Sequence, residues 1–142
     1  GRFPTKNYGP LKVIDHKKMY EDTKMWLDEV GMDFDPKAQL GSLSIGQMQS
    51  VEIAKAVSHQ AKVVIFDEPT RGIDVGAKYE IYQLILDLAN KGKTVIMVSS
   101  EMPELLGVCD RILVMSGGRL AGEVDAKTAT QEDIMRLAAK YV

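Results

Sequence analysis

Two short apolar segments with an amphipathic segment between them constrain the fold of this chain more than any other feature. Residues 63–66 and 94–98 are apolar runs rich in β-branched side chains, which is typical of strands buried inside a parallel sheet. The intervening apolar residues have the spacing of one helix face: Ile81, Leu84, Ile85 and Leu88. We therefore expect an α/β layer in which two parallel strands are joined by a helix that Asp74 caps and that runs to about Asn90.

Further helices and a hairpin are expected on either side of this unit. Ser44 and Gln47 have the spacing of a capping box and predict a helix to about Ser58. The other expected helices cover residues 16–30, a short segment that Ser100 caps, and a last segment that Thr130 caps. Residues 112–115 and 120–124 flank a Gly-Gly pair, which predicts a β-hairpin, whereas residues 1–15 are expected to form a loop.

Composition excludes several classes of protein. The 142 residues carry 18 Lys and Arg against 20 Asp and Glu, so the net charge of −2 does not favour a nucleic-acid-binding surface. No apolar run reaches the roughly 18 residues expected of a membrane span, and no signal-peptide pattern opens the chain. The single cysteine, Cys109, excludes an internal disulfide and is expected to be a small buried residue. These features predict a cytoplasmic domain.

Asp67 and Glu68 directly follow the first buried strand. Their carboxylates are therefore expected at the carboxyl edge of the sheet, where open α/β folds bind ligands. In phosphoryl transfer, the first acid can hold Mg²⁺ and the second can orient or deprotonate the attacking water. A strand that merely ends in solvated acids would look the same, and for this pair alone that alternative is favoured.

Ser44 and Gly46 lie where a helix is expected to begin. A serine hydroxyl, backbone N–H groups and the positive end of the helix dipole together suit a phosphate. An ordinary capping box explains the same residues and is favoured when they are taken alone.

Taken together, the motifs resemble the ATPase subunits of ABC transporters. Leu43-Ser44-Ile45-Gly46-Gln47 is similar to the ABC signature, with Ile45 where glycine is usual. Residues 63–68 resemble a Walker B strand with its catalytic glutamate, and residues 71–74 resemble the D-loop. The finer resemblance is to the two-domain ATPases of ribose- and galactose-type sugar importers. Residues before the shared Asp-Glu-Pro-Thr resemble the first half of those proteins and residues after it the second half, which suggests a splice of two homologous halves.

The resemblance implies a role for each matching residue. Ser44, Gly46 and Gln47 would contact the γ-phosphate of an ATP bound on an opposing ATPase domain. Asp67 would support Mg²⁺ and Glu68 would act as the catalytic residue on the attacking water.

Two further residues of the resemblance have a simpler structural explanation as well. Asp74 would communicate across the dimer interface, although its role as a helix cap is equally available. Ser100 occupies the place of the usual switch histidine. Serine cannot act as a cationic switch, which counts against hydrolysis at this site, and helix capping could be its whole role.

The fold implied by the resemblance is a partial P-loop NTPase (RecA-like) core with part of the ABC helical subdomain and a C-terminal β-hairpin plus helix. Residues 1–142 would form one partial ATPase domain, with the helical subdomain over about 1–60 and the later core sheet over about 61–142. The P-loop pattern G-x-x-x-x-G-K-[ST] is not found in the sequence, since Gly92-Lys93-Thr94 lacks the first glycine. We therefore expect that the chain alone does not hydrolyse ATP.

The implied partners are a second ATPase domain, membrane permease subunits and a periplasmic or lipid-anchored sugar-binding protein, with the ATPase at the inner face of the cell membrane. In the family's sheet, the P-loop strand lies between the strands expected here at 94–98 and 111–115. Without that strand they either close up or expose unpaired edges, which predicts self-association.

Two alternatives to an importer ATPase remain. A non-catalytic folded remnant that only self-associates is compatible with the missing P-loop. An SMC-like DNA-repair ATPase shares the signature and Walker B pattern, but the neutral charge balance and residues 99–104 disfavour it.

Overall fold

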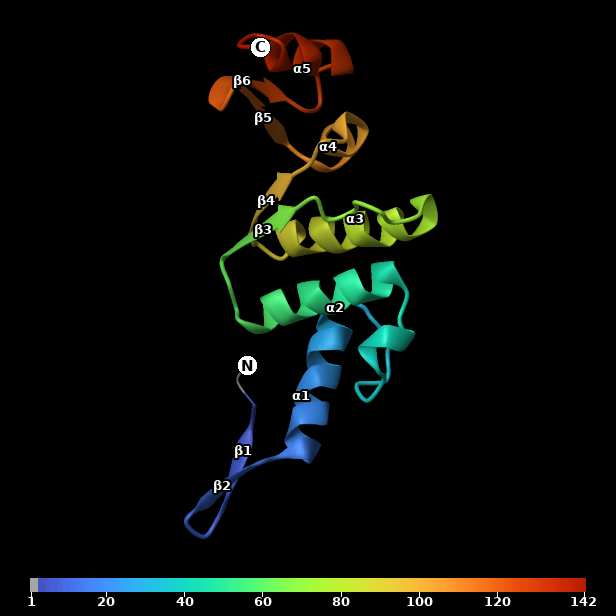
Figure 1. The fold of residues 1–142 in the computed structure, drawn as a ribbon, viewed down its shortest axis with the longest axis vertical. Helices are drawn as coiled ribbons and strands as arrows, with labels where there is room; N and C mark the ends of the chain where they lie inside the picture. The colour runs from blue at the N-terminus through green and yellow to red at the C-terminus, as the bar shows by residue number, and fades with distance from the viewer. Residues whose placement is uncertain (1–2) are drawn as a thin grey trace. The chain divides into compact units, whose positions relative to one another are not determined.

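The computed structural model describes residues 3–142, which form two compact units. One unit contains residues 3–62 and Ile73–Leu84, and the other contains Val63–Gly72 and Ile85–Val142. Figure 1 shows the elements in chain order. These are β1 Thr5–Tyr8, β2 Leu11–Ile14, α1 His16–Glu29, the 3₁₀ turn Leu40–Ser42, α2 Ile45–Ser58, β3 Val63–Asp67, α3 Val75–Asn90, β4 Thr94–Val98, α4 Met102–Val108, β5 Arg111–Ser116, β6 Arg119–Asp125 and α5 Gln131–Ala138.

Helices α1 and α2 pack against each other in the first unit (Figure 1), and both predicted helices are confirmed. Asp15 caps α1 by accepting a hydrogen bond from the Lys18 N–H at 3.2 Å. Gly31 follows the end of α1 with a φ of +73°, a conformation that glycine adopts without steric cost. The buried apolar residues of the two helices are Leu27, Ile53, Ala54 and Val57, and Val30, the C-cap of α1, is buried as well.

The prediction of a loop over residues 1–15 is wrong for most of its length. β1 and β2 pair as an antiparallel hairpin, with Thr5 opposite Ile14 and Tyr8 opposite Leu11. Gly9 takes a φ of +59° at its tip. Every side chain in both strands is exposed. The hairpin therefore lacks the alternation of buried and exposed residues by which a strand is predicted. The first two residues of that predicted loop lie outside the described residues.

Strands β3 and β4 pair in parallel in the second unit, as predicted, with Val63 opposite Thr94 and Asp67 opposite Val98. The expectation that β3 is buried on both faces is wrong. Val64 and Phe66 are buried, whereas Val63 and Ile65 are 49% and 65% exposed. One face of this two-stranded sheet is therefore covered and the other is open.

The predicted C-terminal hairpin is confirmed as β5 and β6, and α5 packs against both strands (Figure 1). The turn between them uses two glycines with φ of +54° and +73°, as a tight hairpin turn requires. The core here contains Ile112, Val114, Ala126 and Ile134, with Cys109 half-buried at its edge.

The described strands form three separate two-stranded sheets, and β4 does not pair with β5. The expected α/β class is confirmed. The strands β4 and β5 were expected either to close up or to expose unpaired edges. They do not close up. Within residues 3–142, no helix combines the length and apolar character that crossing a membrane would require.

Candidate functional site

Glu68 lies immediately after β3 in an unusual backbone conformation. Its φ is +47°, in the left-handed region, which costs an L-residue about 1–2 kcal/mol. Its N–H donates to the Val98 carbonyl at 2.9 Å, extending the parallel ladder by one residue. Its own carbonyl accepts from the Arg71 N–H at 3.1 Å. Strain of this kind persists only where surrounding bonds over-determine it, and it is concentrated at functional sites.

Ser100 holds the Glu68 carboxylate through two hydrogen bonds. The Ser100 N–H donates to Glu68 Oε1 at 3.0 Å, and the Ser100 hydroxyl donates to Glu68 Oε2 at 3.3 Å. The prediction that Ser100 caps the next helix is wrong, because the N-cap of α4 is Glu101. Ser100 is one residue too early for that role, and its polar groups face a carboxylate 32 residues away in the chain.

Thr70, Ser99 and Glu104, which were not predicted as site residues, form a network beside this pair; Thr70 and Glu104 are buried and Ser99 is half-buried. Glu104 in α4 is only 5% exposed, and its carboxylate accepts from the Thr70 hydroxyl at 2.8 and 2.9 Å. The Ser99 hydroxyl also donates to Glu104, at 2.8 Å. A signal for Glu104 was available, since it is an acidic residue between Pro103 and Leu105-Leu106 in a short, mostly apolar helix.

The capping box at the start of α2 is confirmed. Ser44 Oγ accepts from the Gln47 N–H at 3.2 Å, and Gln47 Oε1 accepts from the Ser44 N–H at 2.9 Å. This exchange uses neither the proton of the Ser44 hydroxyl nor the side-chain NH₂ of Gln47. Both donors remain compatible with an anion at an exposed helix N-terminus.

Gly46 is buried, and the structure supplies a packing reason for a glycine at this position. A Cβ at Gly46 would lie 2.9 Å from the Cβ of Ala77 in the first turn of α3. The same Cβ would lie 4.0 Å from Cγ2 of Ile73. The absence of a side chain therefore lets α2 approach the start of α3 closely.

Asp74 precedes α3 as predicted. Its Oδ2 accepts from the Ala77 N–H at 3.4 Å, and its carbonyl accepts from the Lys78 N–H at 3.1 Å. These bonds are those of an N-cap residue, so the capping role is confirmed. The role across a dimer interface stays a prediction.

The predicted site residues fall into two groups, one in each unit. Asp67, Glu68 and Ser100 belong to one unit, where the structure brings Glu68 and Ser100 into direct contact. Ser44, Gly46, Gln47 and Asp74 belong to the other unit.

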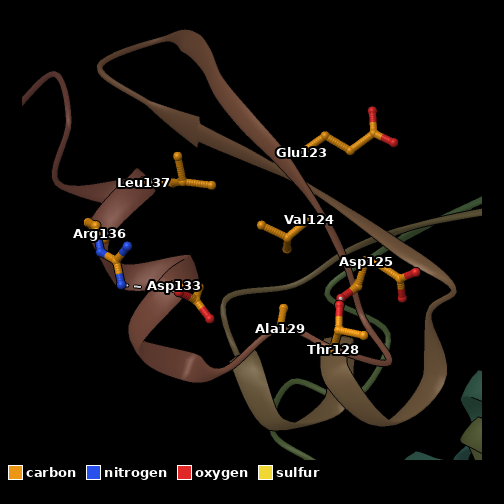
Figure 2. A pocket seen from close by; sticks show the side chains of 8 residues that line it. All are labelled: Glu123, Val124, Asp125, Thr128, Ala129, Asp133, Arg136 and Leu137. Carbon is orange, nitrogen blue, oxygen red and sulfur yellow. Dashed lines mark hydrogen bonds and ion pairs between the residues drawn. The ribbon is translucent and has the colours of Figure 1, made fainter.

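A groove in the second unit is lined by other residues. The groove has a volume of about 450 Å³ and lies between β6 and α5, and an ion pair of 3.1 Å joins Asp133 and Arg136 on its wall. Figure 2 shows the side chains that line it. No predicted site residue lines it.

The residues present fit a nucleotide-borne Mg²⁺ better than a resident metal. Within residues 3–142, no group of three or more His, Cys, Asp or Glu side chains could hold a metal ion. Asp67 is exposed at the sheet edge and offers a carboxylate. Mg²⁺ is commonly held by one or two carboxylates together with substrate phosphates and water, which matches this donor set.

Comparisons of the sequence and the fold with known proteins point to one family. A family model described as ABC transporter matches residues 4–71. An ATP-binding cassette of an ABC transporter has a similar structure, with a TM-score of 0.71 and 27% identity over 94% of this chain and 50% of that one. A nucleotide-free cassette gives a TM-score of 0.72 and 26% identity over 87% of this chain and 47% of that one. The chain is therefore homologous to part of an ABC transporter ATPase domain, and the predicted family and partial-domain fold are confirmed.

The relatives identify a narrower group within this class. The galactose/methyl galactoside import ATP-binding protein MglA of Haemophilus influenzae is 52% identical over 134 residues, which is 94% of this chain and 26% of that protein. The Escherichia coli protein of the same name is 50% identical over 139 residues, which is 96% of this chain and 28% of that protein. The chain thus spans about a quarter of the length of these relatives, which are sugar-import ATP-binding subunits.

Proposed function

We propose that this chain is part of the ATP-binding subunit of a bacterial carbohydrate importer. The observation that carries the proposal is the carboxylate edge of β3, where a strained Glu68 follows Asp67 and is held by Ser100. That edge belongs to a chain half identical to galactose-import ATP-binding proteins. Asp67 would hold Mg²⁺ carried by ATP, and Glu68 would orient or deprotonate the attacking water.

In the same proposal, the start of α2 recognises a phosphate on an opposing ATPase domain. The Ser44 hydroxyl proton and the Gln47 amide protons are the donors left over from the capping box. Gly46 contributes through packing, since its missing side chain fits the α2 N-terminus against Ala77. Asp74 would extend the contact with the opposing domain.

The whole importer would place this subunit in the cytoplasm at the inner face of the membrane. Its partners would be a second ATPase domain, the permease subunits and a sugar-binding protein. Since the 142 residues contain no P-loop pattern, we expect them to bind and hydrolyse MgATP only with a partner that supplies one.

A direct test uses the chain with a complete homologous galactose-import ATPase whose catalytic glutamate is replaced by glutamine. MgATP should drive association of the two proteins in sedimentation, whereas MgADP should not. Ser44→Arg should abolish the association, because the longer side chain blocks the phosphate approach to the α2 N-terminus. Ser42→Arg is the matched control, since Ser42 is also exposed but precedes the capping box.

One outcome would contradict the proposed phosphate recognition, and another would contradict the requirement for a partner. Association that does not depend on MgATP would remove the phosphate-recognition role of α2. Turnover of MgATP by the isolated chain, measured as phosphate release and abolished by Glu68→Gln, would support the role of Glu68 but show that some other element replaces the P-loop.

Self-association of the isolated chain is a second candidate, favoured by the open face of the β3–β4 sheet and by the unpaired outer edges of its two strands. The exposed residues of β3 and β4 include Ile65 at 65% and Val98 at 49%, and β4 does not pair with β5. Open edges and apolar faces of this kind pair with other chains. A monomeric sedimentation profile over a wide concentration range would refute this candidate.

A further inference from the structure

The buried network of Thr70, Ser99 and Glu104 connects two chain segments that carry the Glu68–Ser100 pair. Thr70 lies two residues after Glu68, on the segment that leaves β3. Ser99 lies directly before Ser100, on the segment that leaves β4. Both hydroxyls donate to the same Glu104 carboxylate, at 2.8 to 2.9 Å, so one side chain in α4 joins the ends of the two strands.

A carboxylate this deeply buried needs those donors. Glu104 is 5% exposed and Thr70 is 1% exposed, and removing a charged group from water is costly unless hydrogen bonds replace the lost solvation. The described residues contain no buried side-chain nitrogen or oxygen without a hydrogen-bond partner. The network is thus fully satisfied, and such networks define one geometry rather than several.

The side-chain hydrogen bonds found for this network in the described residues join its members to one another and not to the Glu68 carboxylate. The hydroxyls of Thr70 and Ser99 are both directed to Glu104, and Ser99 Oγ additionally accepts from the Glu101 N–H at 3.0 Å. Glu68, by contrast, is partly exposed, and Ser100 is the side chain that binds its carboxylate within the described residues. The left-handed conformation of Glu68 also has to be maintained against its steric cost.

We propose that Glu104 is a positioning residue for Glu68. By binding Thr70 and Ser99 at once, it fixes the spacing between the segments after β3 and β4. That spacing keeps the Ser100 N–H and hydroxyl within reach of the Glu68 carboxylate. This inference rests on the proposed role of Glu68 in the reaction, but the positioning itself is measurable without nucleotide.

The test is amide hydrogen exchange by NMR on the full chain, corrected for the intrinsic rate of each sequence. The reporter is the Ser100 N–H, which donates to the Glu68 carboxylate. The reference is the Lys127 N–H in the same unit, which donates to Asp125 Oδ1 at 2.8 Å and lies outside the network. Glu68→Ala removes the acceptor and sets the exchange rate of an unbonded Ser100 amide.

Thr70→Val removes one hydroxyl 30 residues away from the reporter and nearly preserves the side-chain shape. We expect it to speed Ser100 exchange on the order of fivefold, the effect of losing one hydrogen bond, while Lys127 exchange changes by less than about twofold. Ser99→Ala should act in the same direction. Thr70→Ser keeps the hydroxyl and should leave Ser100 exchange close to that of the unmodified chain.

Two results would overturn the positioning role. The first is unchanged Ser100 exchange in both Thr70→Val and Ser99→Ala. The second is equal acceleration of Ser100 and Lys127, which would mean that the network only stabilises the unit as a whole. Because the measurement contains no ATP, failure of the MgATP-dependent association would reject the proposed function and leave this result standing.

Discussion

Gly46 and Gly76 allow the packing at the start of α2 to be tested with one substitution at two equivalent positions. Each glycine is the second residue of its helix, and both lie in the same unit. A Cβ at Gly46 would lie 2.9 Å from the Ala77 Cβ, whereas a Cβ at Gly76 would meet nothing closer than Asp74 Oδ2 at 3.5 Å. Gly46→Ala and Gly76→Ala therefore differ in packing and not in helix position.

The expected magnitudes follow from this difference. Alanine in place of glycine favours a helix by up to about 1 kcal/mol, and this gain applies to both variants. A contact of 2.9 Å forces neighbouring atoms to move by about half an ångström, and overpacking of this kind costs about 1–3 kcal/mol. We expect Gly76→Ala to be neutral or stabilising and Gly46→Ala to lie about 1–3 kcal/mol below it in the free energy of unfolding.

The assay is urea unfolding followed by tryptophan fluorescence. Trp26 is the single tryptophan and lies in α1, which packs against α2, so its signal reports on the same unit. The double variant Gly46→Ala/Ala77→Gly removes the opposing Cβ. It should show a favourable coupling of about 1 kcal/mol or more.

Equal stability of Gly46→Ala and Gly76→Ala would refute the packing argument, as would the absence of coupling to Ala77→Gly. In either case the glycine of the signature would need a reason other than the approach of α2 to α3. The remaining explanation would be that a side chain at this position interferes with phosphate binding.

Three further predictions concern single sites. Gln60 is exposed with a φ of +53°, so Gln60→Gly should raise the free energy of unfolding by about 1 kcal/mol in the same urea assay. Burial raises the pKa of the Cys109 thiol above its usual 9.0, helped by the charges of Asp110 and Glu104. The folded state therefore keeps its full stability below pH 9.0 and loses stability as pH rises through the raised pKa of the folded thiol. Cys109 alkylation at pH 9 should accordingly be slower in the folded chain than in urea. Hydrogen bonds from Thr130 lower the pKa of Asp133, so the α5 capping box should persist below pH 3.8 and weaken as pH falls through the lowered pKa, which the Asp133 carboxyl shift in an NMR titration would show.

Most of the secondary structure could be predicted because its signals are local. The capping residues Ser44 and Thr130 lie within three residues of the backbone groups they bind. The apolar runs of β3 and β4 and the Gly-Gly turn between β5 and β6 likewise need only a short window of sequence. Elements of this kind are specified before any distant contact forms.

The N-terminal hairpin could not be predicted from such a window. All of its side chains are exposed, so hydrophobic periodicity, the main signal for a strand, is absent. Its pairing depends on backbone hydrogen bonds and on the Gly9-Pro10 turn. A turn that contains glycine and proline is equally typical of a loop.

The candidate site could be predicted in its carboxylates and not in its supporting contacts. Asp67 and Glu68 are recognisable because they end an apolar strand. The partners of Glu68 and Thr70 are 32 and 34 residues away, at Ser100 and Glu104, and no local pattern connects them. The sequence predicts Ser100 as a helix cap because it does not show that the Glu68 carboxylate, 32 residues away in the chain, lies within hydrogen-bonding distance.

The backbone conformation of Glu68 explains why the contacts that the sequence does not predict are those of the candidate site. A non-glycine residue with a φ of +47° contradicts the local preference of glutamate, and glycine would adopt that conformation at lower cost. The conformation is held by hydrogen bonds with Val98, Arg71 and Ser100. Val98 and Ser100 lie at the end of β4, so those bonds depend on the parallel pairing of β3 with β4, whereas the bond from Arg71 closes a local turn. A chain that keeps a costly residue at such a position gains something other than local stability from its carboxylate. Backbone strain alone does not mark a site, since Gln60 has a φ of +53° as well. The strained backbone together with the carboxylate bonds from Ser100 is what supports the proposal of Glu68, rather than the exposed acids elsewhere on the surface, as the residue at the centre of the site.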